Sequence, residues 1–159
     1  MVDAVSGADP VLRSARPGEG ETIRALVRAA YANYAKQVGR TPGPVKDDYE
    51  RRIAASEVWV VQYGDDVVGV IVLKEQGDDL VIVIDNVAVL PAAQGHGLGR
   101  MLITFAEQEA CQRGFAEVRL YANVIMTRNI ALYEHLGFVE VDRFRDGGAT
   151  RIQMAKRIR

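Results

Sequence analysis

The stretch that decides the fold is VAVLPAAQGHGLGRML, residues 87–102. Its first residues close a run of aliphatic and β-branched side chains over 80–90, which is typical of a strand buried on both faces. Glycines follow at 95, 97 and 99, and a helical pattern of apolar residues begins at 98. A strand that passes through a glycine-rich loop into a helix presents the unpaired N–H groups of the helix start to an anion. The stretch therefore predicts a phosphate-binding loop.

The spacing of the glycines argues against two common nucleotide loops. A Walker loop places Lys and then Ser or Thr at the helix start, whereas this chain has Gly99-Arg100-Met101. A dinucleotide loop needs Gly-x-Gly-x-x-Gly in the first strand–helix unit, whereas this chain has Gly-His-Gly-Leu-Gly after an expected hairpin. A tight turn that binds nothing is disfavoured by three glycines within five residues.

The composition of the 159 residues is that of one globular domain. Lys and Arg number 20 and Asp and Glu number 21, so no basic field is available to hold nucleic acid. The single cysteine and the two separated histidines give no metal-ligand pattern, and we expect no metal. No apolar run approaches the ~20 residues of a membrane-spanning helix. We expect a cytoplasmic protein, without a membrane partner, that has a flexible tail over 1–10 and a single domain over 11–159.

The period of the hydrophobic pattern changes several times along the chain. Strands are expected at 11–16, 58–63, 67–73, 80–90, 117–122, 138–142 and 150–156. Helices are expected where apolar residues recur from 23 to 34, at 46–55, from 98 to the glycine at 114, and at 127–136. Hairpins come early and strand–helix–strand crossovers come late, a pattern that predicts an α/β (α+β) fold around a mixed sheet.

Two motifs resemble those of the GNAT N-acetyltransferase superfamily. Residues 94–99 match its Gln/Arg-x-x-Gly-x-Gly/Ala motif, and the flanking NVAVLP and RMLITFAEQEA match as well. Downstream, NIALYEHLGFVEV at 129–141 looks like the second motif of the family, in which a tyrosine precedes Leu-Gly-Phe. The resemblance covers roughly 58–157. It implies a GNAT-like mixed, mostly antiparallel central sheet of 6–7 strands, flanked by about four helices.

The resemblance implies acetyl-CoA as the cosubstrate. In this family the backbone amides of the loop hold the pyrophosphate of coenzyme A, a role that carries over to Gln94, Gly95, His96, Gly97, Leu98, Gly99 and Arg100. The preceding strand pairs with the pantetheine arm through its main chain, which implicates Val87, Ala88 and Val89. Asn129 is a further candidate contact, although the commoner family pattern places this Asn seven residues before the tyrosine, where this chain has Met126. Asn123 is the alternative.

Two residues are candidates for proton transfer. Tyr133 matches the family tyrosine near the coenzyme sulfur, and its phenol is suited to give a proton to the departing thiolate. The alternative is an aromatic residue on a packed helix face. Asp85, a candidate general base, interrupts the long strand where an acid is costly to bury, and it shares a strand face with Val87 and Val89. Glu75 is the second candidate base, and a structurally partnered Asp85 is the alternative.

The acceptor site of the family lies between the first two helices and the central strands. In this chain that region holds Tyr31, Tyr34 and Tyr49, which could form an aromatic wall for an amine or simply pack. The acids nearby could attract a cationic amine or solvate the surface; they are Asp47, Asp48 and Glu50.

Together these features predict an N-acetyltransferase that moves an acetyl group from acetyl-CoA to the primary amine of a small molecule, by direct attack in a ternary complex. Three alternatives stay open: another acyl group, a non-catalytic coenzyme A sensor, and an acetyltransferase for protein N-termini or lysines. Dimerisation is common in the family, so a homodimer is among the expected assemblies.

Overall fold

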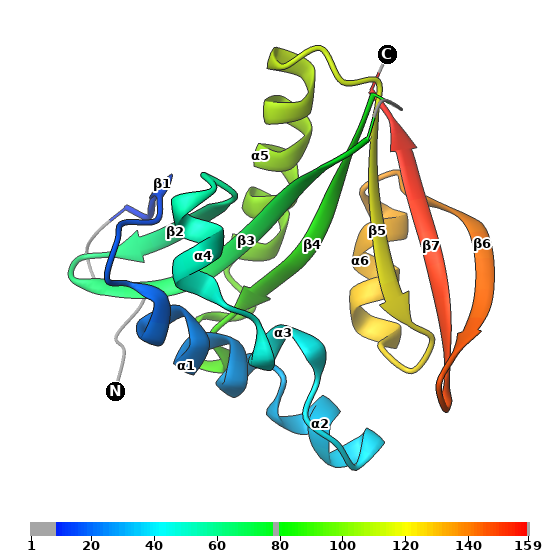
Figure 1. Cartoon of the computed structure of the whole chain (residues 1–159), viewed down its shortest axis with the longest axis horizontal. Helices are drawn as coiled ribbons and strands as arrows, with labels where there is room; N and C mark the ends of the chain where they lie inside the picture. The colour runs from blue at the N-terminus through cyan, green and yellow to red at the C-terminus, as the bar shows by residue number, and fades with distance from the viewer. Residues whose placement is uncertain (1–8, 78–79, 159) are drawn as a thin grey trace. The chain divides into compact units, whose positions relative to one another are not determined.

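The computed structural model describes residues 9–77 and 80–158, and within them seven strands form one sheet in the order β1-β2-β3-β4-β5-β7-β6 (Figure 1). The strands are β1 (Val11–Ser14), β2 (Val58–Tyr63), β3 (Asp66–Gln76), β4 (Val81–Val89), β5 (Glu117–Asn123), β6 (Val139–Asp146) and β7 (Ala149–Arg157). The pair β4–β5 is parallel, whereas β1–β2, β2–β3, β5–β7 and β6–β7 are antiparallel. The predicted mixed, mostly antiparallel sheet is confirmed. The expected tail lies largely outside the described residues.

The described residues contain six α-helices, more than the four expected, and one 3-10 turn. They are α1 (Gly20–Ala30), α2 (Ala32–Val38), α3 (Gly43–Lys46), α4 (Tyr49–Ala54), η1 (Pro91–Ala93), α5 (Leu98–Gln112) and α6 (Thr127–His135). The helix expected over 23–34 divides at Tyr31 into α1 and α2. The helix α1 buries Ile23, Leu26 and Val27, whereas α2 itself has no buried residue. Helix α2 therefore has no buried side chain that would attach it to the core in the way that α1 is attached.

The chain divides into two compact units, one made of residues 1–72 and 86–102 and the other of 73–85 and 103–159. Strands β3 and β4 and helix α5 each contribute residues to both units. In the first unit, α1 and α4 pack on β2, β3 and the end of β4. Its core comprises Ile23, Leu26, Val27, Val45, Tyr49, Ile53, Val58, Val60, Val70, Val72 and Ala88.

Side chains from α4 and its start fix the helix ends of the first unit. The Glu50 carboxylate accepts hydrogen bonds from the N–H groups of Gly18 and Gly20, at 3.0 and 2.6 Å, and so caps the start of α1. The Asp48 side chain caps α4 by accepting from the Arg51 N–H at 3.1 Å. Both acids therefore have a structural role in this unit.

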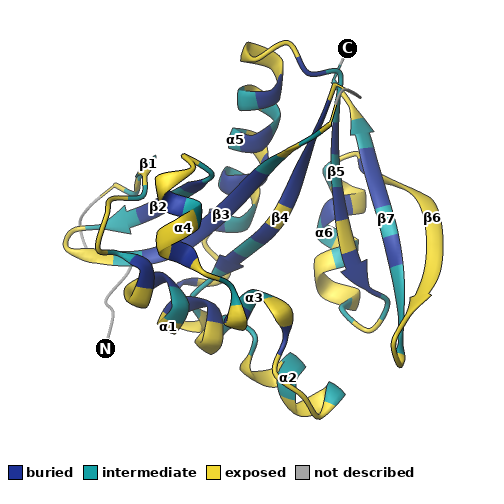
Figure 2. Ribbon diagram, in the orientation of Figure 1, coloured by how far each residue is buried: buried dark blue, intermediate teal, exposed yellow. Residues whose placement is uncertain are grey.

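In the second unit, β4 begins as a strand buried on both faces. Residues 81–84 are all buried and pair in parallel with 117–120 of β5 (Figure 2). Lys156 of β7 joins two helices, because its Nζ donates to the Leu136 carbonyl at 2.7 Å and pairs with Glu107 of α5 at 2.5 Å. The turn after α6 is thereby fixed to both β7 and α5.

Strand β6 extends further than expected, and all eight of its residues are exposed (Figure 2). It pairs with β7 as far as Asp146 opposite Ala149, with a register shift between Glu140 and Asp142. A turn at Gly147 and Gly148 joins β6 to β7, with Gly147 at φ +61°. The apolar signal at 138–142 therefore marks only the start of this strand, since the remainder is held by main-chain pairing to β7.

Candidate active site

The second half of β4 alternates between buried and accessible positions. Asn86 and Ala88 are buried, whereas Val87 and Val89 are half-buried and Asp85 is exposed. This alternation is what a strand with one covered face produces. The expectation that Asp85 lies at a buried position is wrong, because the doubly buried part of β4 ends at Ile84.

Two glycines of the loop have the left-handed backbone conformation that occurs in anion-binding nests. Gly95 and Gly97 have φ values of +85° and +79°, a region that side chains rarely adopt. A Cβ built on either glycine would meet nothing within 4 Å. The loop residues 94–97 and Arg100 are exposed, whereas Leu98 is buried and anchors the first turn of α5.

Helix α5 begins directly after this loop. Its first intrahelical bond runs from the Met101 N–H to the Gly97 carbonyl at 3.0 Å, so the preceding N–H groups at the helix start have no partner within the helix. Two left-handed glycines precede the N-terminus of a 15-residue helix, where the aligned peptide dipoles produce a partial positive charge. The open space beside the glycines, the polarity of the helix start and the Arg100 side chain fit a diphosphate.

The Gln94 side chain ties the loop to the strand before it. Its Nε2 donates to the Val89 carbonyl at 3.0 Å, and its backbone N–H donates to the Pro91 carbonyl at 3.3 Å. In the structure this side chain braces the loop against the end of β4.

Tyr133 lies on α6 and is 7% exposed. Its ring makes an edge contact with Phe138 at a centroid distance of 6.3 Å, and its carbonyl accepts from the Phe138 N–H at 3.0 Å. Burial raises the pKa of Tyr133 to about 12, because the phenolate would lose its hydration. The hydroxyl is therefore neutral at physiological pH, the state from which a phenol can donate a proton.

This pKa makes stability depend on pH in alkaline solution. The unfolded chain loses the phenolic proton near pH 10, whereas the folded chain keeps it until about pH 12. The free energy of unfolding therefore falls as the pH rises from 10 to 12. We expect the free energy of unfolding of Tyr133→Phe to fall with pH less steeply than that of wild type, by about 1 kcal/mol per pH unit. Urea unfolding between pH 9 and 11.5 measures this slope. An unchanged slope would show that burial does not perturb this hydroxyl.

The two asparagines of the second unit differ in exposure. Asn129, one helical turn before Tyr133 on α6, is exposed. Asn123 is 4% exposed, and its Oδ1 accepts from the Ile125 N–H at 3.1 Å, which shapes the turn after β5. Of the two, Asn129 has the side chain that a ligand can reach. The alternative base, Glu75, is paired with Arg113 at 3.7 Å.

The three tyrosines proposed for the acceptor all lie in the first unit but differ in exposure. Tyr31 and Tyr34 are half-buried, with their rings edge to face at 6.1 Å. Tyr49 is fully buried, and burial followed by the Asp47 charge raises its pKa to about 12. An aromatic wall would therefore be formed by Tyr31 and Tyr34, with Tyr49 behind them in the core.

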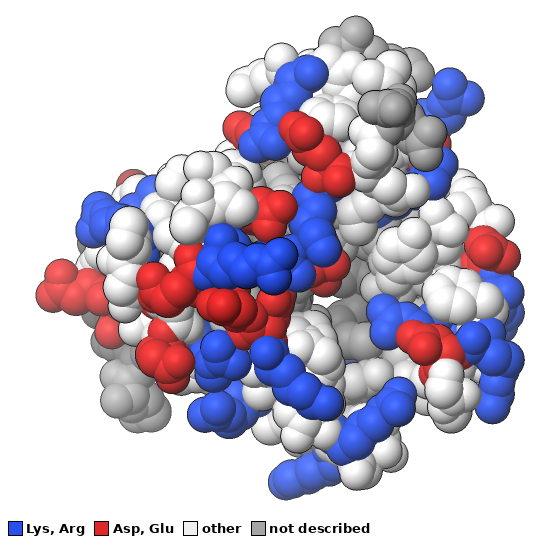
Figure 3. Space-filling model, viewed as in Figure 1, with Lys and Arg blue, Asp and Glu red and all other residues white. Residues whose placement is uncertain are grey.

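The acidic cluster near these tyrosines is used within the unit. Asp47 pairs with Arg52 at 2.8 Å, and Arg52 also pairs with Glu57 at 3.4 Å. Figure 3 shows Lys and Arg beside Asp and Glu on the face that carries α1 and α4. Asp47, Asp48 and Glu50 therefore serve ion pairs and helix caps, which leaves no unpaired acidic patch in this set for a cationic amine.

Sequence reasoning missed Asn86, which is 5% exposed in β4. Its amide contacts two of the three tyrosines, with Oδ1 accepting from the Tyr31 hydroxyl at 2.8 Å and Nδ2 donating to the Tyr49 oxygen at 3.1 Å. The available signal was a polar residue at an inward position of an alternating strand.

The family model described as the acetyltransferase (GNAT) family matches residues 23–138, which include the first motif, the second motif as far as Phe138, and strands β2 to β5. The chain belongs to the acetyltransferase (GNAT) family. The expected N-acetyltransferase is thereby confirmed at the level of the family. In the part of this GNAT chain that the structure describes, no helix is both long and apolar enough to cross a membrane.

Individual GNAT relatives are distant. The chain is 27% identical over 146 residues to the uncharacterized N-acetyltransferase YjgM of Escherichia coli, covering 87% of each protein. It is 35% identical over 77 residues to a mycothiol acetyltransferase of Jonesia denitrificans, which covers 48% of this chain and 24% of that enzyme.

Solved GNAT structures share the fold. The PaiA N-acetyltransferase of Thermoplasma acidophilum in complex with coenzyme A has a TM-score of 0.79 at 18% identity, covering 94% of this chain and 99% of that one. The ribosomal-protein-S18-alanine N-acetyltransferase of Escherichia coli has a TM-score of 0.75 at 23% identity, covering 94% of both chains.

Proposed function

We propose that this GNAT protein is an acetyl-CoA-dependent N-acetyltransferase whose acceptor is the primary amine of a small molecule. The observation that carries the proposal is the open loop at residues 94–100. Two left-handed glycines there lead into the unpaired N–H groups of α5. The coenzyme A complex of a structural neighbour supports the same ligand class.

Each residue proposed for coenzyme binding has a definite task. The amides of residues 94–100 bind the pyrophosphate, and Arg100 adds a positive charge. The main chain of residues 87–89 pairs with the amides of the pantetheine arm, and Asn129 supplies a further polar contact. The cosubstrate itself brings an acetyl group activated as a thioester.

Two side chains move protons in the proposed reaction. Asp85, accessible on β4, removes a proton from the ammonium form of the acceptor, directly or through a water. The free amine attacks the acetyl carbonyl in the ternary complex, the carbon–sulfur bond breaks, and Tyr133 gives its proton to the departing thiolate. The acetylated nitrogen then loses its second proton, directly or through a water, to the Tyr133 phenolate, which restores the hydroxyl. The match of Tyr133 to the tyrosine of the second motif supports this role.

A coenzyme titration tests the binding half of the proposal. We expect coenzyme A to release or absorb measurable heat in calorimetry and to raise the free energy of unfolding by about 2.7 kcal/mol at 100 times its dissociation constant. Adenosine, which lacks the pyrophosphate, is the matched control and should stabilise much less. A protein that binds neither compound contradicts the proposal.

A thiol-release assay with acetyl-CoA tests the transfer half. The acceptor panel comprises phenethylamine, spermidine, glucosamine, free amino acids and a peptide with an N-terminal alanine. Turnover with a small amine supports the proposal. Turnover with the peptide alone indicates a protein acetyltransferase, and coenzyme binding without any turnover indicates a sensor.

A further inference from the structure

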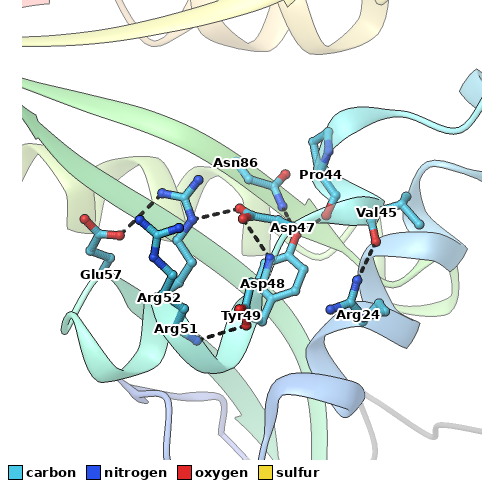
Figure 4. Close-up of polar contacts among 10 residues, drawn as sticks. All are labelled: Arg24, Pro44, Val45, Asp47, Asp48, Tyr49, Arg51, Arg52, Glu57 and Asn86. Atoms are coloured by element: carbon cyan, nitrogen blue, oxygen red, sulfur yellow. Dashed lines mark hydrogen bonds and ion pairs between the residues drawn. The ribbon is translucent and has the colours of Figure 1, made fainter.

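A chain of hydrogen bonds crosses the first unit from Tyr31, between α1 and α2, to α3 by way of β4. The Tyr31 hydroxyl bonds to Asn86 Oδ1 at 2.8 Å, and Asn86 Nδ2 bonds to the Tyr49 oxygen at 3.1 Å. The Tyr49 hydroxyl in turn bonds to the Pro44 carbonyl. Figure 4 shows the Asn86, Tyr49 and Pro44 part of this chain.

The direction of each bond follows from the chemistry of its groups. A backbone carbonyl only accepts, so the single Tyr49 hydroxyl proton goes to Pro44. The Tyr49 oxygen must then accept from Asn86, which fixes the NH₂ side of the amide toward Tyr49 and its oxygen toward Tyr31. Asn86 needs to donate on one side and accept on the other. A carboxylate of the same shape cannot do this, because it only accepts.

This chain of hydrogen bonds holds helix α3, a short element that has little support of its own. Helix α3 has four residues, too few to be stable alone. Besides the Tyr49 bond to Pro44, it is held by Arg24, which donates to the Val45 carbonyl at 2.9 Å and lies 5.8 Å from the Tyr49 ring centre (Figure 4). Asn86 is thus linked to α3 through Tyr49 on the Nδ2 side of its amide. On the Oδ1 side it bonds directly to the half-buried Tyr31.

We propose that Asn86 is a positioning residue for the acceptor amine. It fixes both Tyr31 and α3 to β4, next to Val87, where the proposed pantetheine contacts begin. The residues proposed for the acceptor and those proposed for the pantetheine arm are therefore both positioned by β4. The inference rests on the proposed function and adds to it the residue that sets the geometry of the acceptor. Asn86 is 5% exposed, so it acts through its partners.

The test separates acceptor binding from coenzyme binding. Asn86→Asp keeps the shape and removes the donor, and Asn86→Leu removes both polar groups. The probe is the amine of the panel above with the highest wild-type turnover. We expect the KM for this amine to rise about tenfold or more in both variants, because buried partners lose their bonds. The dissociation constant of coenzyme A should stay within about twofold of wild type.

Two further variants keep the inference falsifiable if the Asn86 variants fail to fold. Tyr31→Phe removes the hydroxyl at one end of the chain of hydrogen bonds and keeps the half-buried ring. We expect it to raise the KM for the same amine with little change in coenzyme affinity. Tyr63 lies on β2 and has no place in this chain of hydrogen bonds. Tyr63→Phe is therefore the matched control and should leave the KM for the amine and the dissociation constant of coenzyme A unchanged. The inference is overturned if the KM for the amine is unchanged in Tyr31→Phe and in those Asn86 variants that fold. A parallel loss of coenzyme affinity also overturns it.

Failure of the proposed function has a different signature. A wild-type protein that does not bind coenzyme A, or that transfers no acetyl group to any amine, overturns the proposed function and the positioning role together. A wild type that is active, with Asn86→Asp equal to it in every constant, overturns the positioning role alone.

Discussion

We expect Tyr133→Phe to lower kcat by about 10²- to 10⁴-fold, the range that a positioned general acid contributes. The substitution removes one hydroxyl and keeps the ring that contacts Phe138 at 6.3 Å, so α6 retains its packing. The dissociation constant of coenzyme A should therefore stay within about twofold of wild type by calorimetry, since the loss falls on the chemical step. The measurement is kcat for the best acceptor at saturating acetyl-CoA.

Tyr121→Phe is the matched control for this variant. Tyr121 also makes an edge contact in the second unit, with Phe144 at 6.2 Å, but its side chain is exposed and carries no proposed role. We expect its kcat to match wild type. Equal kcat values for Tyr133→Phe and wild type would assign Tyr133 to packing alone.

The second large effect is expected at the glycine loop. Gly97→Ala places a Cβ in the open space beside the helix start and strains a backbone with φ +79°. The loop would move out of the conformation that aims its amides at the pyrophosphate. We expect the dissociation constant of coenzyme A to rise about 10- to 100-fold, the cost of one or two bonds to a charged group. Isothermal calorimetry measures it.

Gly114→Ala separates this effect from loss of stability. Gly114 follows the other end of α5, with φ +82° and equally open space around its Cβ. Both variants should therefore lose about 1–2 kcal/mol of unfolding free energy. Only Gly97→Ala should lose coenzyme affinity. Equal affinities in the two variants would remove the loop from the binding site.

Features that depend on neighbouring residues were predictable from the sequence. The strand, the glycine loop and helix α5 were placed because their signals lie within one short stretch, residues 80–114. Strand β2 was predicted with its observed bounds, since a glycine turn and β-branched residues mark it. The parallel pairing of β4 with β5 agrees with the expected strand–helix–strand crossover.

Features that depend on distant partners were not predictable. The Glu50 cap on α1 joins residues 30 and 32 positions apart, and the Tyr31–Asn86 bond spans 55. The exposure of Asp85 was missed because hydrophobic content does not say where a strand stops being covered on both faces. The inward orientation of Asn86 could be predicted only if its partners were known, Tyr31 between α1 and α2 and Tyr49 on α4.

The Glu50 cap makes two remote positions of the chain mutually dependent. A Cβ at residue 20 would meet Glu50 Oε2 at 2.5 Å, so a larger residue at 20 requires the flexible Glu50 side chain to move away from its present position. A shorter residue at 50 would make room but would leave the Gly18 and Gly20 amides without their carboxylate. A side chain at position 20 and the Glu50 cap therefore compete for the same space, and a substitution at one position changes what the other can do.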